Sequence, residues 1–199
     1  MDGQGATLIN PVWKEVWKLC IPGKVRIFLW KVLHGVLPCH GVLANRHIPV
    51  QVQCHRCAVG FEDIQHCLFG CKRAKQVWKE IGLYEEIQKA IVLDRSGSVN
   101  MEHLICELTM IDGEIKSAEL IAVAVWYIWW QCRQEVRDEH VQPADKTTVT
   151  IKAMTLNFMR ANSSKIIRRK EADIWKKPSQ GVSKVNVDAS FHVDSLSGA

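Results

Sequence analysis

One stretch of eighteen residues constrains this chain more than any other. It places Cys54, Cys57, His66 and Cys71 in the pattern C-x2-C-x8-H-x4-C. A C-x2-C pair forms a tight turn that points two thiolates at one cation, and a histidine and a cysteine downstream can complete a tetrahedral shell. Such a shell of three sulfurs and one nitrogen leaves no position for a reacting water. The pattern therefore predicts one structural zinc ion rather than a catalytic one.

The spacing leaves the identity of one ligand open. Cys67 and Cys71 are four residues apart, which places them on one face if the segment is an α-helix. Cys67 therefore competes with His66 as a ligand, and His55 inside the turn is a weaker candidate. The other cysteines lack partners at ligand spacing, and we interpret them as core or surface thiols; they are Cys20, Cys39, Cys106 and Cys132.

Composition places the chain among soluble globular proteins. It has 199 residues, enough for one or two domains, with 47% hydrophobic and 24% charged residues. The formal net charge of +5 is compatible with nucleic-acid contact. The longest apolar run, from Leu120 to Trp130, is about half as long as a membrane span and predicts a buried helix. No secretory signal is visible, so we expect an intracellular protein, nuclear or cytoplasmic, without a transmembrane segment.

Hydrophobic periodicity predicts a mainly helical chain. Residues 11–34 read as two helices broken at Pro22-Gly23, a short helix is expected around 40–46, and another runs from Cys71 to Gly82. Residues 94–100 are predicted to be a loop. Two long helices follow, at about 114–139 and 145–172. The first contains the Trp126–Trp130 cluster, whose helical setting favours burial over stacking on bases.

Two groups of basic residues are weak candidates for nucleic-acid contacts. Lys72 and Arg73 lie at the start of the helix that follows the zinc pattern, and Arg168, Arg169 and Lys170 lie near the end of the last helix. Either group could bind phosphates, and the second could act as a nuclear address. A solvated helix surface is the preferred interpretation of the first group, and a solvated helix end and linker explain the second at least as well.

The pattern changes after residue 175. Lys176 to Gly181 is predicted to be a linker, and apolar residues then alternate with polar ones from Lys184 to Phe191. A period of two predicts a β-strand. A new fold is therefore expected to begin here.

The run from Trp13 to Trp78 resembles a known family, the zinc-binding domain that follows the reverse transcriptase in plant non-LTR (LINE-type) retrotransposons. The resemblance implies that Cys54, Cys57, His66 and Cys71 bind the metal. Cys67 departs from the family, which usually has an apolar residue there. The matching residues are Trp17-Lys18-Leu19, Ile21-Pro22, Lys24 to Trp30, Leu33-His34, Leu37-Pro38, Leu43-Ala44, Arg46, Cys54, Cys57, Glu62, His66, Cys71, Ala74 and Val77-Trp78.

The C-terminal segment resembles the start of the ribonuclease H-like domain found downstream in these elements. Trp175 to Pro178, Gly181 and Lys184 to Ser190 carry this likeness. It implies that Asp188 corresponds to the first metal-ligating aspartate of that family. Nuclease chemistry needs several carboxylates around two metal ions. Because the other carboxylates are missing, the nuclease site is expected to be incomplete, and magnesium would be a cofactor only of an intact domain.

Together these patterns predict a mainly α fold with three parts. A small zinc-stapled helical domain spans 11–82, a long helical connector spans 83–174, and one or two β-strands of a truncated ribonuclease H-like α/β domain lie in 175–199. The expected function is a non-enzymatic zinc-binding module that binds RNA or DNA backbones or acts as a scaffold for the missing reverse transcriptase and ribonuclease H domains. The alternatives are a truncated, inactive nuclease and a helical protein-interaction module.

Overall fold

The computed structural model describes residues 12–93, 96–107, 117–167, 178–181, 191–192 and 197–198. Its chain divides into two compact units, Met1–Ile166 and Ile167–Ala199. The first unit contains the predicted zinc ligands and all of the packed helices described below.

The predicted N-terminal helices are present. Helix α1 is Val12–Lys18, α2 is Gly23–Leu33 and α3 is His40–Ala44. The break between α1 and α2 has the extended Pro22 as the N-cap of α2, which agrees with the preference of proline for the start of a helix. The apolar stripe of α2 is buried, with Val25, Leu29 and Val32 inaccessible to solvent. Helical periodicity therefore identified both the elements and their inward faces.

The region after the cysteine turn is more helical than the sequence indicated. A π-helix, η1 (His66–Gly70), precedes α4 (Lys72–Ile81), and α4 ends at Gly82 in the left-handed conformation. Helices α5 (Tyr84–Leu93) and α6 (Gly97–Glu107) follow. The prediction of a loop over 94–100 is wrong from Gly97 onward, because those residues begin α6. Their glycine and serine residues act as a helix start rather than as a linker.

Both long helices are present in the described residues. Helix α7 is Ser117–Val136 and α8 is Ala144–Ile167. The stretch Ile121–Val125 of α7 is inaccessible on every face, which explains its continuous apolar sequence. The Trp126–Trp130 cluster is mostly covered: Tyr127 and Ile128 are buried, Trp126 and Trp129 are partly buried, and Trp130 is 39% exposed. Burial is therefore confirmed as its main role.

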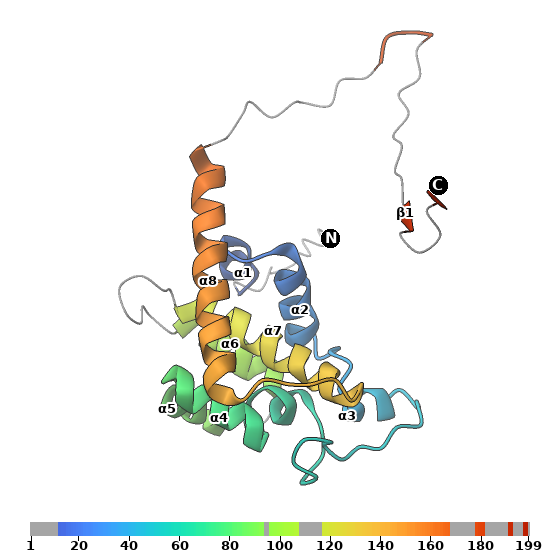
Figure 1. The fold of residues 1–199 in the computed structure, drawn as a ribbon, viewed down its shortest axis with the longest axis vertical. Helices are drawn as coiled ribbons and strands as arrows, with labels where there is room; N and C mark the ends of the chain where they lie inside the picture. Colours follow the sequence, from blue (N-terminus) through green and yellow to red (C-terminus); the bar gives the residue numbers. More distant parts are fainter. Residues whose placement is uncertain are drawn as a thin grey trace, which may run out of the picture. The chain divides into compact units, whose positions relative to one another are not determined.

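Helices α6 and α7 lie among the other helices (Figure 1). Helix α6 packs against α1, α2, α5 and α7, and α7 also contacts α2 and η1. Polar links join these distant segments. The Cys20 N–H donates to Glu119 of α7 at 3.2 Å, and the Ser98 hydroxyl of α6 donates to the Val32 carbonyl at 2.7 Å. The helices after residue 83 thus share one core with the helices around the cysteine turn.

The second unit has little described structure. Strands β1 (Phe191–His192) and β2 (Ser197–Gly198) pair antiparallel, with Phe191 opposite Gly198. Two strands of two residues each do not support the predicted start of an α/β domain. The strand expected from Lys184 to Phe191 lies outside the described residues, apart from Phe191 in β1.

The N-terminus of α6 approaches the backbone beside His66 too closely for any side chain. A Cβ atom at Gly97 would lie 2.7 Å from the Gln65 nitrogen and 2.6 Å from Cγ2 of Ile64. We expect Gly97→Ala to lower the free energy of unfolding by about 1–3 kcal/mol through overpacking. Gly23→Ala is the matched control, because a Cβ there meets nothing within 4 Å. It should be neutral or stabilising by up to about 1 kcal/mol.

Urea denaturation of both variants measures the difference. Equal stability of Gly97→Ala and Gly23→Ala would contradict the close approach of α6 to this loop.

Candidate metal centre

Backbone hydrogen bonds shape the turn that carries the first two cysteines. The Glu62 N–H donates to the Val52 carbonyl at 2.9 Å, which holds the two arms of the turn together. Inside it, the Cys54 N–H donates to Gly60 at 3.3 Å and the Ala58 N–H donates to Cys54 at 2.9 Å. Gly60 has a φ of 85°, a left-handed conformation that costs glycine little. Backbone hydrogen bonds therefore close the C-x2-C turn.

The other two ligands are positioned by the π-helix. In η1 the Cys71 N–H donates to the His66 carbonyl at 2.7 Å, so the turn spans five residues rather than four. At its start, the His66 N–H donates to the Asp63 carboxylate at 2.6 Å. Cys71 is extended and caps α4. A wider turn brings residues five apart, His66 and Cys71, toward the same point.

These segments converge on one group of four potential ligand atoms. The sulfurs of Cys54, Cys57 and Cys71 and a ring nitrogen of His66 all lie within 4.8 Å of one another. The Sγ atoms of Cys54 and Cys71 are 3.8 Å apart, and Cys57 Sγ lies 3.4 Å from His66 Nε2. A tetrahedral zinc ion with bonds of about 2.3 Å to sulfur and about 2.0 Å to nitrogen separates its ligands by about 3.5–3.8 Å. The cluster therefore fits one structural zinc.

Burial shifts the pKa values of three of the four potential ligands toward their neutral forms, so a metal ion that binds them must displace protons from the thiols. Burial raises the pKa of the Cys54 thiol to about 12, although the backbone N–H groups of Cys57 and Arg56 partly offset it. Burial also raises the pKa of Cys71, and it lowers the pKa of His66. The lowered pKa favours the neutral imidazole of His66, which is the form that binds a metal ion. The two buried thiols release their protons when zinc binds, so zinc affinity rises with pH.

The competing ligands lie elsewhere. Cys67 is buried, and its sulfur makes hydrogen-bonding contact with Cys132 of α7 and with Cys39. His55 is exposed, and its ring meets the edge of His40 at 5.0 Å between centroids. Among the described residues, the four-residue metal-binding group contains neither of them. The α-helical face that made Cys67 attractive does not exist, because the backbone there is a π-helix.

Glu62 connects the turn to α3. It is 4% exposed, and its side chain accepts a hydrogen bond from the His40 N–H at 3.3 Å. Its Oε2 lies 3.5 Å from Nδ1 of His40, and its carbonyl accepts from the Gly41 N–H at 2.9 Å. Glu62 therefore caps the start of α3, a structural role for a residue in the family pattern.

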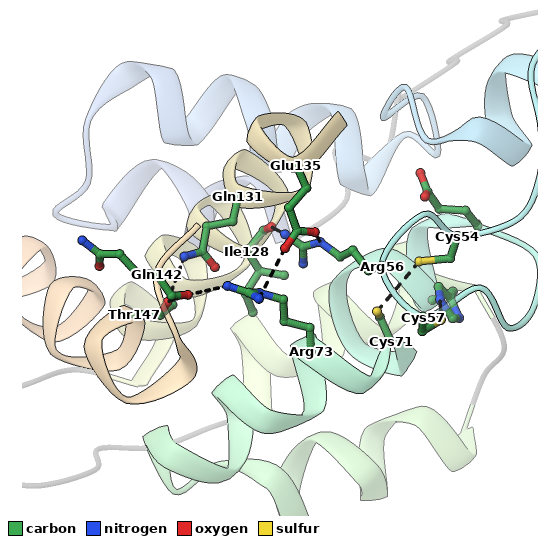
Figure 2. A network of polar contacts seen from close by, with 12 residues as sticks. Cys54, Arg56, Cys57, Cys71, Arg73, Ile128, Gln131, Glu135, Gln142 and Thr147 are labelled. Carbon is green, nitrogen blue, oxygen red and sulfur yellow. Dashed lines mark hydrogen bonds and ion pairs between the residues drawn. The ribbon is translucent and has the colours of Figure 1, made fainter. Parts of the chain in front are cut away.

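A buried ion-pair network joins the cysteine turn to α7. Arg56 lies between Cys54 and Cys57, and its Nε is 2.6 Å from Oε2 of Glu135. Its side chain is only 2% exposed, and it also donates to the Ile128 carbonyl at 3.2 Å. Arg73 approaches the other oxygen of Glu135 at 3.4 Å (Figure 2). One carboxylate of α7 thus holds both the metal-binding turn and the first turn of α4.

The two basic residues of α4 that were predicted to contact nucleic acid differ in their surroundings, because one is ion-paired and the other is exposed. Arg73 is engaged by Glu135 and by the carbonyl of Gln142, so its charge is directed inward. Lys72 is exposed at the start of α4. Arg168, Arg169 and Lys170 lie outside the described residues, as does Asp188.

Sequence reasoning missed Arg56 and Glu135 as structural partners. They are separated by 79 positions, and neither belongs to a motif. One signal was available in the sequence. Arg56 lies inside the C-x2-C turn, and a positively charged side chain there must point away from the metal cation. Nothing in the sequence near Glu135 identified it as the acceptor.

No helix in the described part of the chain is both long and apolar enough to cross a membrane.

Residues 4–78 match the family described as zinc-binding in reverse transcriptase. This match confirms the resemblance predicted from the sequence and includes all four residues of the metal-binding group.

The chain is also similar to an Arabidopsis thaliana protein named "Putative ribonuclease H protein". The two are 25% identical over 194 residues, which cover 88% of this chain and 28% of that relative. The chain therefore spans little more than a quarter of the relative's length. The similarity agrees with the second part of the predicted resemblance. No solved structure matches the chain significantly.

We expect Glu135→Gln to destabilise the fold by about 2–3 kcal/mol, because it leaves the buried Arg56 guanidinium without its countercharge. The expected loss of unfolding free energy is smaller than for a fully buried ion pair, because the Glu135 side chain is 23% exposed. The matched control is Lys18→Gln, which removes the pair with Glu15 whose side chains are 67% and 43% exposed. It should cost less than about 1 kcal/mol.

Urea denaturation of the zinc-loaded variants is the measurement, with zinc content determined in parallel. Equal stability of the two variants would show that the Arg56–Glu135 pair does not hold the turn on α7.

Proposed function

We propose that this chain is a zinc-stabilised module of a reverse transcriptase polyprotein that binds nucleic-acid backbones without strong sequence preference. The metal-binding group inside a reverse-transcriptase zinc-binding match supports the proposal most directly. We propose Cys54, Cys57, His66 and Cys71 as the zinc ligands. A shell filled by four protein ligands gives the metal a role in folding rather than in catalysis.

Charge supports contact with a polyanion. The formal net charge is +5, and α4 has four basic residues, of which one, Arg73, is paired with Glu135. Contacts of this kind read the phosphate backbone and not the bases. We propose that the chain acts in the nucleus or the cytoplasm, where such partners occur.

We propose that the chain has three parts, a zinc-binding domain at 11–82, a helical connector at 83–174 and the start of a ribonuclease H-like domain at 175–199, and that the first two work as one body. Helices α6 and α7 of the second region pack against α1 and α2 of the first. The second region would therefore be a structural partner of the zinc domain and not a free spacer.

Scaffolding is a second candidate function, and a specific surface favours it. Helices α1 and α2 expose three large apolar side chains: Trp17 is 66% exposed, Ile27 60% and Trp30 47%. Large exposed apolar residues of this kind are candidates for a docking surface. A reverse transcriptase or ribonuclease H domain of the same polyprotein is the partner that this proposal implies.

We expect the purified zinc-loaded protein to bind single-stranded RNA, single-stranded DNA and an RNA–DNA hybrid with similar affinities that fall as salt increases. Fluorescence anisotropy with labelled oligonucleotides of mixed sequence measures this. The chelator-treated protein is the control and should bind more weakly, because its fold is lost.

Absence of binding to all three probes at low salt would refute nucleic-acid binding and leave scaffolding. The same samples, incubated with magnesium, test the nuclease alternative. We expect the hybrid to remain intact, and cleavage lost in Asp188→Asn would instead support a ribonuclease H.

A further inference from the structure

A hollow of about 610 Å³ lies directly beside the metal-binding group. One side of it is formed by metal-site residues, including Cys57, His66 and Gly70. The other side is formed by α4, which contributes three lysines and Gln76. The lysines are Lys72, Lys75 and Lys79. They occupy positions i, i+3 and i+7 of one helix, so they share a face.

The three lysines give this hollow a positive charge that the described residues do not neutralise. No acidic side chain is among the described residues that line it. None of the ion pairs in the described ranges involves Lys72, Lys75 or Lys79. The Lys79 ammonium lies 4.8 Å from the centroid of the Tyr84 ring, an interaction that orients it and leaves its charge in place.

The metal site reduces this charge without cancelling it. One zinc ion with three thiolates and one neutral imidazole carries a single net negative charge. Among the lining residues and the metal, the three ammonium groups therefore leave a surplus of two positive charges. The Asp63 and Glu62 carboxylates, which act electrostatically on His66, lie outside the lining. Zinc also fixes the wall, because Cys57 and His66 belong both to the metal-binding group and to the lining.

We propose that this hollow binds the phosphodiester backbone of a nucleic-acid strand through Lys72, Lys75 and Lys79, an inference that rests on the proposed nucleic-acid function. From Lys72 to Lys79 the helix rises about 10.5 Å. Phosphates along one strand of a duplex rise about 3.4 Å each along the helix axis, so the row of three ammonium groups covers about three phosphate steps of axial rise. A row of separated point charges suits an extended polyanion better than one free phosphate. Arg73, on the same helix, is excluded because Glu135 holds it.

The test compares two triple variants with the same change in net charge. Lys72→Gln/Lys75→Gln/Lys79→Gln removes the charge of the hollow. Lys89→Gln/Lys146→Gln/Lys152→Gln removes three lysines from α5 and α8, away from the lining. Zinc content and thermal unfolding of both variants should equal those of the parent, since these side chains are not in the core.

Binding of a labelled single-stranded RNA is measured by anisotropy over a series of salt concentrations. The hollow variant should bind at least about tenfold more weakly at low salt. The slope of log affinity against log salt should fall by about 2, because each single-strand phosphate contact contributes about 0.7. The control variant should stay within about twofold of the parent.

Equal weakening of both variants, or no weakening in either, would overturn the hollow as the binding site while the nucleic-acid function stands. A parent that binds no RNA would refute the nucleic-acid function itself. Inorganic phosphate is the second probe. It should displace RNA no better than sulfate of equal ionic strength, and selective displacement that depends on the three lysines would instead identify a site for free phosphate.

Discussion

The convergence of three thiols and one imidazole on a single point is the constraint on which the rest of the structure depends. From Asn45 to Phe61, Cys54 is the only buried apolar residue, so this segment has almost no apolar core of its own. Unsupported segments of this kind cannot offset the entropy of ordering their backbone. The cluster fits one zinc ion, and we propose that a metal bound by Cys54 and Cys57 on one side and by His66 and Cys71 on the other supplies the missing free energy and fixes the turn against η1.

The cysteine turn carries Arg56, and the ion pair of Arg56 with Glu135 connects the metal-binding turn to α7 in the helical core. Arg56 and Arg73 share the carboxylate of Glu135, so α7 is held by one residue from the cysteine turn and one from α4. This arrangement also separates the roles of basic residues that are similar in the sequence. Arg73 points inward to Glu135, whereas Lys72 lines the hollow beside the metal. The arginine that joins α4 to α7 and a lysine that we propose to bind nucleic acid thus lie side by side in the sequence of one helix.

The sequence predicted those features whose signal is local. Helical periodicity identified α1, α2, α4, α7 and α8, and the spacing of cysteines identified the metal-binding group, because both depend on neighbouring residues. It was incomplete where the signal is not local or is ambiguous. His66 was the predicted ligand, and Cys67 remained a competitor because an α-helix would place it on one face with Cys71. The π-turn removes that face. Gly97 and Ser98 resemble a loop, yet Gly97 permits the close approach of α6 to Ile64. Only the three-dimensional structure identifies Glu135 as the ion-pair partner of Arg56.

X-ray absorption spectroscopy at the zinc edge of the purified protein tests the central claim most directly. A shell of three sulfurs at about 2.3 Å and one nitrogen at about 2.0 Å is the predicted result. In His66→Ala the nitrogen contribution should disappear, whereas Cys67→Ala should leave the spectrum unchanged. A shell of four sulfurs that loses one in Cys67→Ala would contradict the proposed ligand set, and a folded protein without zinc would contradict the metal-dependent fold altogether.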